Sequence, residues 1–123
     1  EIISKGWCKE KQGFSQYYGS KYLDAANLLM SEYNFFDRED PLFIKNTRSS
    51  YKYLCSTALS YRYRAQDDFG ISKTAFTICS FWMIRALHQI GETKQAQNLF
   101  DTILKYQSPL GLMSEGICFK SKQ

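Results

Sequence analysis

The sequence predicts an all-α protein made of helical hairpins of an α/α toroid, with this chain forming a partial barrel. Two observations lead to this fold class. Apolar residues recur at steps of three and four residues over several stretches, which is typical of helices. The two halves of the chain also share one layout, in which a mostly apolar helix, a short turn, an amphipathic helix and a polar loop follow one another. Two hairpins cannot close a ring alone, so we expect a piece of a larger barrel or self-association.

Four helices are predicted in order. The first spans residues 22–36, with Ser20 as its N-cap, and the second spans 41–56, where Asp40 followed by Pro41 is a strong start signal. The third spans 71–90 and is the most apolar, and Gly91 is placed to end it. The fourth spans 92–106. Residues 1–20 are broken by glycines, and we expect a helix end followed by a hairpin-like loop.

Corresponding features of the two halves lie about 50 residues apart, as Leu28 and Ile78 do. This period is longer than the 34 residues of a tetratricopeptide repeat. An open helical-repeat module that only binds partners remains the alternative function, and the phrase GETKQAQNLF faintly resembles such a repeat. Inner helices that are apolar on most sides favour the closed ring, because an open solenoid leaves one side of its inner layer wet.

The composition excludes several functional classes. The net charge of +4 is mild and the basic residues are scattered, so we expect no nucleic-acid partner. No apolar run approaches a membrane span, and we expect no membrane partner. Four cysteines without CxxC spacing and one histidine predict neither a metal site nor a cofactor, and they suit a cytoplasmic protein.

Two polar loops carry the candidate chemistry. In a toroid the loops that follow the outer helices gather at one mouth, so the loops 56–70 and 110–116 are expected to bring five side chains together: Arg62, Arg64, Asp67, Asp68 and Glu115. Each alone has a plainer explanation, such as a surface ion pair or the start of a further helix. Carboxyl groups with polar partners suit hydrolysis of a glycosidic bond, which needs one acid and one base.

Three segments of the sequence resemble those of a known protein family. YGSKYLDAANLLM, then YRYRAQDDFGISKTAFTICSFW, then LGLMSEG closely resemble glycoside hydrolase family 15, in its bacterial glucoamylase-like and trehalase-like branch. The resemblance runs from about residue 7 to residue 117, nearly the whole chain. It implies an (α/α)6 barrel, often preceded by a β-sandwich domain, that releases glucose from α-glucosides such as α-glucans or trehalose with inversion of configuration.

The resemblance also implies roles for individual residues. Glu115, in GLMSE, matches the general base that activates water, and Arg62, in YRY, matches an arginine that binds sugar hydroxyls at the cleavage subsite. Asp67 or Asp68 matches an acidic partner of a glucose hydroxyl. Three matched positions of the inner helix are expected to be structural: Cys79, Phe81 and Trp82.

The sequence departs from the family pattern at two places. The family's general acid lies on an earlier hairpin, which we expect upstream of Glu1. After Ser114-Glu115 the family usually continues through an Asp-rich turn into a Gly-Asn-Phe-Pro-Gln-like segment, whereas this chain continues with GICFKSKQ. We therefore expect residues 1–123 to be the C-terminal part of the catalytic barrel, with little or no activity alone because the base lacks its acid. The missing part of the barrel is the expected partner.

Overall fold

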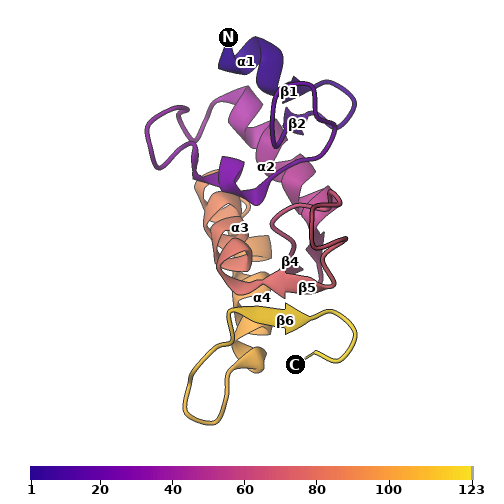
Figure 1. The fold of residues 1–123 in the computed structure, drawn as a ribbon. Helices are drawn as coiled ribbons and strands as arrows, with labels where there is room; N and C mark the ends of the chain where they lie inside the picture. Colours follow the sequence, from indigo (N-terminus) through magenta and orange to yellow (C-terminus); the bar gives the residue numbers. More distant parts are fainter. Residues whose placement is uncertain (123) are drawn as a thin grey trace.

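A computed structural model describes residues 1–122 of the chain. Three helices, α2, α3 and α4, form the body, and short strands and loops lie beside it and at its ends (Figure 1). The elements are, in order, α1 (Ile2–Gly6), β1 (Trp7–Cys8), β2 (Gly13–Phe14), the 3-10 helix η1 (Ala25–Leu29), α2 (Pro41–Leu54), β3 (Cys55–Ser56), β4 (Leu59–Ser60), β5 (Thr74–Phe76), α3 (Thr77–Gln89), α4 (Thr93–Ile103), the 3-10 helix η2 (Leu104–Tyr106) and β6 (Gly116–Cys118).

Local signals correctly placed the start of α2 and the turn between α3 and α4. The side chain of Asp40 accepts a hydrogen bond from the Leu42 amide at 2.8 Å, and Pro41 opens α2. Gly91 adopts φ +89, a conformation that glycine reaches without strain, and its amide bonds to the His88 carbonyl at the end of α3. The first twenty residues form the expected short helix and hairpin, in which β1 pairs with β2.

The predicted helix over residues 22–36 is wrong. Leu23 is extended and forms a β-bridge with Ser15, and only η1 is helical in this region. The N-cap is Asp24 rather than Ser20. The side-chain amide of Asn27 donates to the Phe14 and Ser15 carbonyls, at 3.1 and 3.3 Å, which ties the segment to the N-terminal hairpin. These tertiary contacts override the apolar periodicity, so the first half of the expected repeat lacks its inner helix.

The third helix begins six residues later than predicted, at Thr77 rather than Ile71. Residues Thr74–Phe76 instead form β5, which pairs antiparallel with β6 in the register Ala75↔Ile117. β-Branched and aromatic residues at this position suit a strand once a partner strand is present. The pairing joins the start of α3 to the end of the chain (Figure 1).

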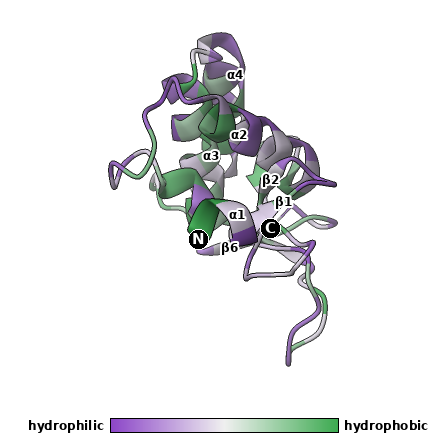
Figure 2. Ribbon diagram, turned by 90° about the horizontal axis from the view of Figure 1, so that it is seen from above, coloured by the Kyte–Doolittle hydropathy of each residue, from purple (hydrophilic) through white to green (hydrophobic). Residues whose placement is uncertain are grey.

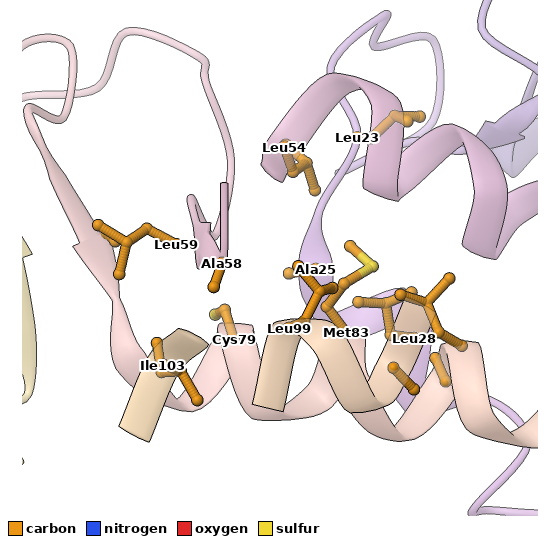
Figure 3. Packing of buried hydrophobic residues seen from close by; sticks show 14 of the residues in the cluster. Leu23, Ala25, Leu28, Leu54, Ala58, Leu59, Cys79, Met83, Leu99 and Ile103 are labelled. Atoms are coloured by element: carbon orange, nitrogen blue, oxygen red, sulfur yellow. The ribbon is translucent and has the colours of Figure 1, made fainter. Parts of the chain in front are cut away.

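The core lies where α2, η1, α3 and α4 meet, and Figure 3 shows their side chains in one cluster. Met83 and Leu87 of α3 are fully buried, as is Ile103 of α4. In Figure 2 the helices carry both hydrophobic and hydrophilic stretches, whereas the projecting loops are largely hydrophilic. Cys79 is buried, and Phe81 and Trp82 are partly buried against the cluster, as their expected packing role requires.

α3 is not buried on all sides. Its inner face is buried, but Ile78 on the other side remains 48% exposed and Arg85 forms an ion pair with Glu32. Other large apolar side chains are also at the surface, among them Ile2 and Ile3 of α1, whose apolar colouring is visible near the N-terminus in Figure 2. None of the helices within residues 1–122 is both long and apolar enough to cross a membrane.

Candidate active site

A cleft of about 430 Å³ lies between the loop that precedes β5 and the β5–β6 pair. Both predicted polar loops contribute to its walls. Its lining consists of Arg62, Tyr63, Asp67, Phe69, Gly70, Ser72, Thr74, Ala75, Phe76, Glu115 and Gly116. The structure thus brings together three of the five side chains expected to converge, Arg62 and Asp67 from one loop and Glu115 from the other.

Hydrogen bonds to the backbone of the Glu115 loop hold it next to the start of α3. The Glu115 carbonyl accepts a hydrogen bond from the Thr77 amide at 2.8 Å, and the Thr77 hydroxyl donates to the Ser114 carbonyl at 2.7 Å. The first bond satisfies one of the amides that a helix leaves unpaired at its N-terminus. The Glu115 carboxylate is exposed and has no hydrogen-bond or ion-pair partner among residues 1–122. It is therefore free to act on a ligand in the cleft.

Arg62 is held by Asp24 and Ala25, two residues that lie far from it in the sequence. Its Nε lies 3.5 Å from Oδ1 of Asp24, and its carbonyl accepts a hydrogen bond from the Ala25 amide at 2.7 Å. Asp24 is only 8% exposed, so the arginine offsets the cost of burying its carboxylate. The Arg62 side chain is half-exposed and reaches the cleft wall. Its planar N–H donors suit neighbouring hydroxyl groups.

Asp67 organises a tight turn that ends at Gly70. The Gly70 amide donates to the Asp67 carbonyl at 2.9 Å, and φ of Gly70 is +90. The two carboxylate oxygens of Asp67 accept from the Phe69 amide at 2.8 Å and from the Tyr63 hydroxyl at 2.9 Å. That hydrogen bond, together with the negative charge of Asp67, raises the pKa of the Tyr63 phenol above its ordinary value. Both carboxylate oxygens of Asp67 therefore already act as hydrogen-bond acceptors within the turn.

Two of the five side chains expected to converge lie outside the cleft. Asp68 is exposed and does not line the cleft, which separates it from its neighbour Asp67. Arg64 stacks on the ring of Tyr61 at 5.0 Å and lines a different hollow beside Lys11. The expected convergence of five side chains is thus wrong for Arg64 and Asp68.

The aromatic and apolar part of the wall is formed by Phe69 and Phe76. Phe69 is fully exposed at the tip of the Asp67 turn, and the bonds of that turn fix its backbone. An apolar ring beside hydroxyl-binding polar groups suits a sugar, whose faces carry C–H groups and whose edges carry hydroxyls.

Metal ligands are not grouped in the described part of the chain, where no cluster of three His, Cys, Asp or Glu side chains could hold an ion. All four cysteines are free thiols. Burial raises the pKa of Cys79 to about 12 and that of Cys55 to about 12, so both are inert at neutral pH. None of the four lines the cleft.

Sequence reasoning missed two residues that hold the site together. The sequence pattern predicts Asp24 to lie in a helix, and it gives Tyr63 no role beyond its place in the YRY motif. A charged residue inside the otherwise apolar phrase YLDAANLL is a signal that could have been used, because a buried carboxylate requires a partner. Nothing local in the sequence indicates that this partner is Arg62.

Comparison with known proteins identifies relatives of one kind. The chain is 38% identical over 107 residues to a trehalase of Mycobacterium tuberculosis, covering 85% of this chain and 16% of the relative. It is 35% identical over 121 residues to a trehalase of Mycolicibacterium smegmatis (95% and 18%), and 32% identical over 122 residues to a trehalase of Thermoplasma volcanium (98% and 20%).

The similarity therefore extends over nearly the whole chain, but the chain spans a fifth or less of the length of these curated relatives. No protein-family model matches it, and no solved structure does. The matches support a relationship to trehalase-like glycoside hydrolases.

Proposed function

We propose that these residues are the C-terminal part of the catalytic (α/α)6 barrel of a family 15 glycoside hydrolase, which cleaves an α-glucoside with inversion and has trehalose as its first candidate substrate. The carrying observation is the cleft in which Arg62 and Asp67 from one loop face the same space as Glu115 from another. The trehalase names of the relatives favour trehalose over longer α-glucans.

Glu115 is the proposed general base. Its carboxylate has no partner among residues 1–122, and a base must be free to take a proton from water. The activated water attacks the anomeric carbon from the face opposite the leaving group. A general acid from the preceding part of the barrel protonates the departing oxygen. The two carboxyl groups would stand roughly 6.5–9.5 Å apart, which leaves room for the water.

Arg62 and Asp67 are the proposed binding pair. The arginine donates to sugar hydroxyls, and the lone pairs of Asp67 that its turn does not use accept from them. Asp67 rather than Asp68 is the proposed acidic partner because it lines the cleft. Neither residue needs to change its protonation state for this role.

The rest of the barrel is the proposed partner of the exposed apolar side chains. Ile78 of α3 is 48% exposed, and Leu110 and Leu112 of the Glu115 loop are 85% and 68% exposed. Neighbouring hairpins of a toroid would cover such residues, as would a second copy of this chain. The general acid would come from the same missing part, so the 123 residues alone are expected to be inactive.

The test uses the complete gene product that carries these residues. It is incubated with trehalose, maltose and maltotriose, and the glucose released is followed by proton NMR before its anomers equilibrate. An inverting enzyme produces equal amounts of α- and β-glucose from trehalose, whereas a retaining enzyme produces only α-glucose at first. Release of both anomers supports the proposal, and hydrolysis that gives only α-glucose contradicts the inverting mechanism.

The alternative is a helical-repeat module that binds a partner without chemistry. The α3–α4 hairpin is the one observation in its favour, because paired antiparallel helices are the unit of such repeats. Complete absence of glucose release from all three sugars by the folded gene product would favour this alternative.

A further inference from the structure

Asp24 is a buried carboxylate that contacts both its own segment and a distant part of the chain. The residue is 8% exposed, and its Oδ1 accepts a hydrogen bond from the Ala26 amide at 2.8 Å. That bond caps η1 and would exist with any short polar acceptor at this position. The same oxygen lies 3.5 Å from Nε of Arg62, which comes from a distant part of the chain. The cap alone does not explain why the acceptor carries a charge.

The contact with Arg62 is reinforced by the backbone. The amide of Ala25, the next residue after Asp24, donates to the Arg62 carbonyl at 2.7 Å. One short segment therefore fixes both the main chain and the inner edge of the guanidinium of a single arginine. Ala25 is fully buried, so this junction is part of the packed core rather than a loose surface contact.

The ion pair with Asp24 leaves part of the Arg62 guanidinium available to a ligand. Its closest contact uses Nε, and the two terminal nitrogens, with four N–H groups, donate no hydrogen bond to a residue within 1–122. Arg62 lines the cleft that also contains Glu115. A free arginine side chain samples many rotamers, and anchoring its inner edge reduces the entropy lost when a ligand binds its outer edge.

We propose that Asp24 is a positioning residue for Arg62, holding the guanidinium so that its terminal N–H groups meet the hydroxyls of a bound α-glucoside. This inference rests on the proposed function and names the group that prepares its binding site. Asp24 itself does not line the cleft, so we expect no direct contact between its side chain and the sugar.

Substitution of Asp24 by Asn separates positioning from capping. Asparagine keeps an oxygen that can accept from the Ala26 amide, but it has no charge to hold Arg62. Asp40→Asn is the matched control, because the Asp40 carboxylate also accepts from the amide two residues on, at 2.8 Å, and has no arginine partner within residues 1–122. Asp40 lies at the start of α2 and does not line the cleft.

The measurement is kcat and KM for trehalose in the complete gene product. We expect Asp24→Asn to raise KM about two- to fivefold with little change in kcat, as the loss of one partly exposed ion pair predicts. Asp40→Asn should leave KM unchanged. Arg62→Gln should raise KM further, and adding Asp24→Asn to Arg62→Gln should have no additional effect, because Asp24 acts through Arg62.

A merely structural role predicts a different result, in which Asp24→Asn weakens the enzyme equally with and without Arg62. That outcome overturns the inference, as does a KM unchanged by Asp24→Asn alone. Asp24→Ser, which keeps a capping oxygen, guards against a folding failure of the Asn variant. If both variants are unfolded by circular dichroism, Asp24 serves the fold and not the site. If neither Arg62→Gln nor Glu115→Gln changes the kinetics, the proposed function itself is at fault.

Discussion

The amide of Thr77 donates a hydrogen bond to the carbonyl of Glu115 at 2.8 Å, which joins the first turn of α3 to the loop that precedes β6. The Thr77 hydroxyl adds a second bond, to the Ser114 carbonyl at 2.7 Å. The proposed base is thus positioned by the start of the same helix that supplies Met83 and Leu87 to the core. Helix α3 therefore contributes both to the position of the proposed base and to the packing of the core.

Thr77→Val tests the hydroxyl bond. Threonine and valine have nearly the same shape, so the variant removes one donor from a residue that is 6% exposed and leaves the Ser114 carbonyl without it. We expect a loss of about 1–2 kcal/mol in the free energy of unfolding, measured by urea denaturation, and a lower kcat in the complete gene product. Thr102→Val is the control, since the Thr102 hydroxyl donates to the Asn98 carbonyl at 2.8 Å in an exposed turn of α4. Equal effects of the two variants on kcat would contradict a link between Thr77 and the site.

Asp67 and Asp68 allow a matched comparison, because Asp67 lines the cleft and Asp68 does not. Asp67→Asn should raise KM for the sugar about tenfold or more, because it removes a charged acceptor from the cleft and loosens the turn that carries Phe69. Asp68→Asn should change KM less than about twofold, since the side chain lies at the exposed surface outside the cleft. Steady-state kinetics on trehalose measure both. A larger effect at Asp68 would reverse the assignment.

Thiol reactivity should differ sharply among the cysteines. Hydrogen bonds from the Ser121 side chain and backbone lower the pKa of Cys118 to about 7. Its thiolate fraction rises as the pH rises through that value, so alkylation by iodoacetamide should reach half its maximal rate near pH 7. Cys55 and Cys79, with pKa values of about 12, should stay unmodified in the folded protein up to pH 9.

Mass spectrometry of peptides alkylated between pH 6 and 9 measures this order. Ser121→Ala should move the midpoint of Cys118 toward 9, the ordinary value for a thiol. A midpoint near 9 in the unaltered protein would show that the hydrogen bonds from Ser121 do not form in solution.

Core packing is tested by two residues of α3 with similar side-chain volumes. Leu87→Ala removes a fully buried side chain and should cost about 2–5 kcal/mol of unfolding free energy. Ile78→Ala, at a position 48% exposed, should cost less than about 1 kcal/mol in the 123-residue chain. A cost for Ile78→Ala that rises to several kcal/mol in the complete gene product would indicate that other parts of the protein cover this face.

The elements that sequence reasoning placed correctly are those specified by neighbours in the chain. Asp40 and Pro41 start α2, and Gly91 ends the turn after α3, through bonds that span only a few residues. The segment 22–36 has an equally helical pattern, but its backbone is held by the bond from Asn27 to Phe14 and by the bridge from Leu23 to Ser15. Periodicity alone cannot reveal such partners.

The same distinction applies to the site. The family resemblance could select Arg62 and Glu115 but left Asp67 and Asp68 as alternatives, and of these two only Asp67 lines the cleft with the other residues. Asp24 and the Thr77–Glu115 junction depend on pairings between segments far apart in the chain. The strand pairing of β5 with β6, which sets the position of Glu115, was also missed because Thr74–Phe76 continues an apolar run that reads as a helix.

The most direct test of the account is the rate of trehalose hydrolysis by Glu115→Gln in the complete gene product. Glutamine keeps the size of the side chain but cannot take a proton from water, so kcat should fall by about 10²–10⁴-fold while the melting temperature stays unchanged. Glu39→Gln, at another exposed glutamate that does not line the cleft, should retain full activity. A Glu115→Gln enzyme that hydrolyses trehalose at the unaltered rate would contradict the account.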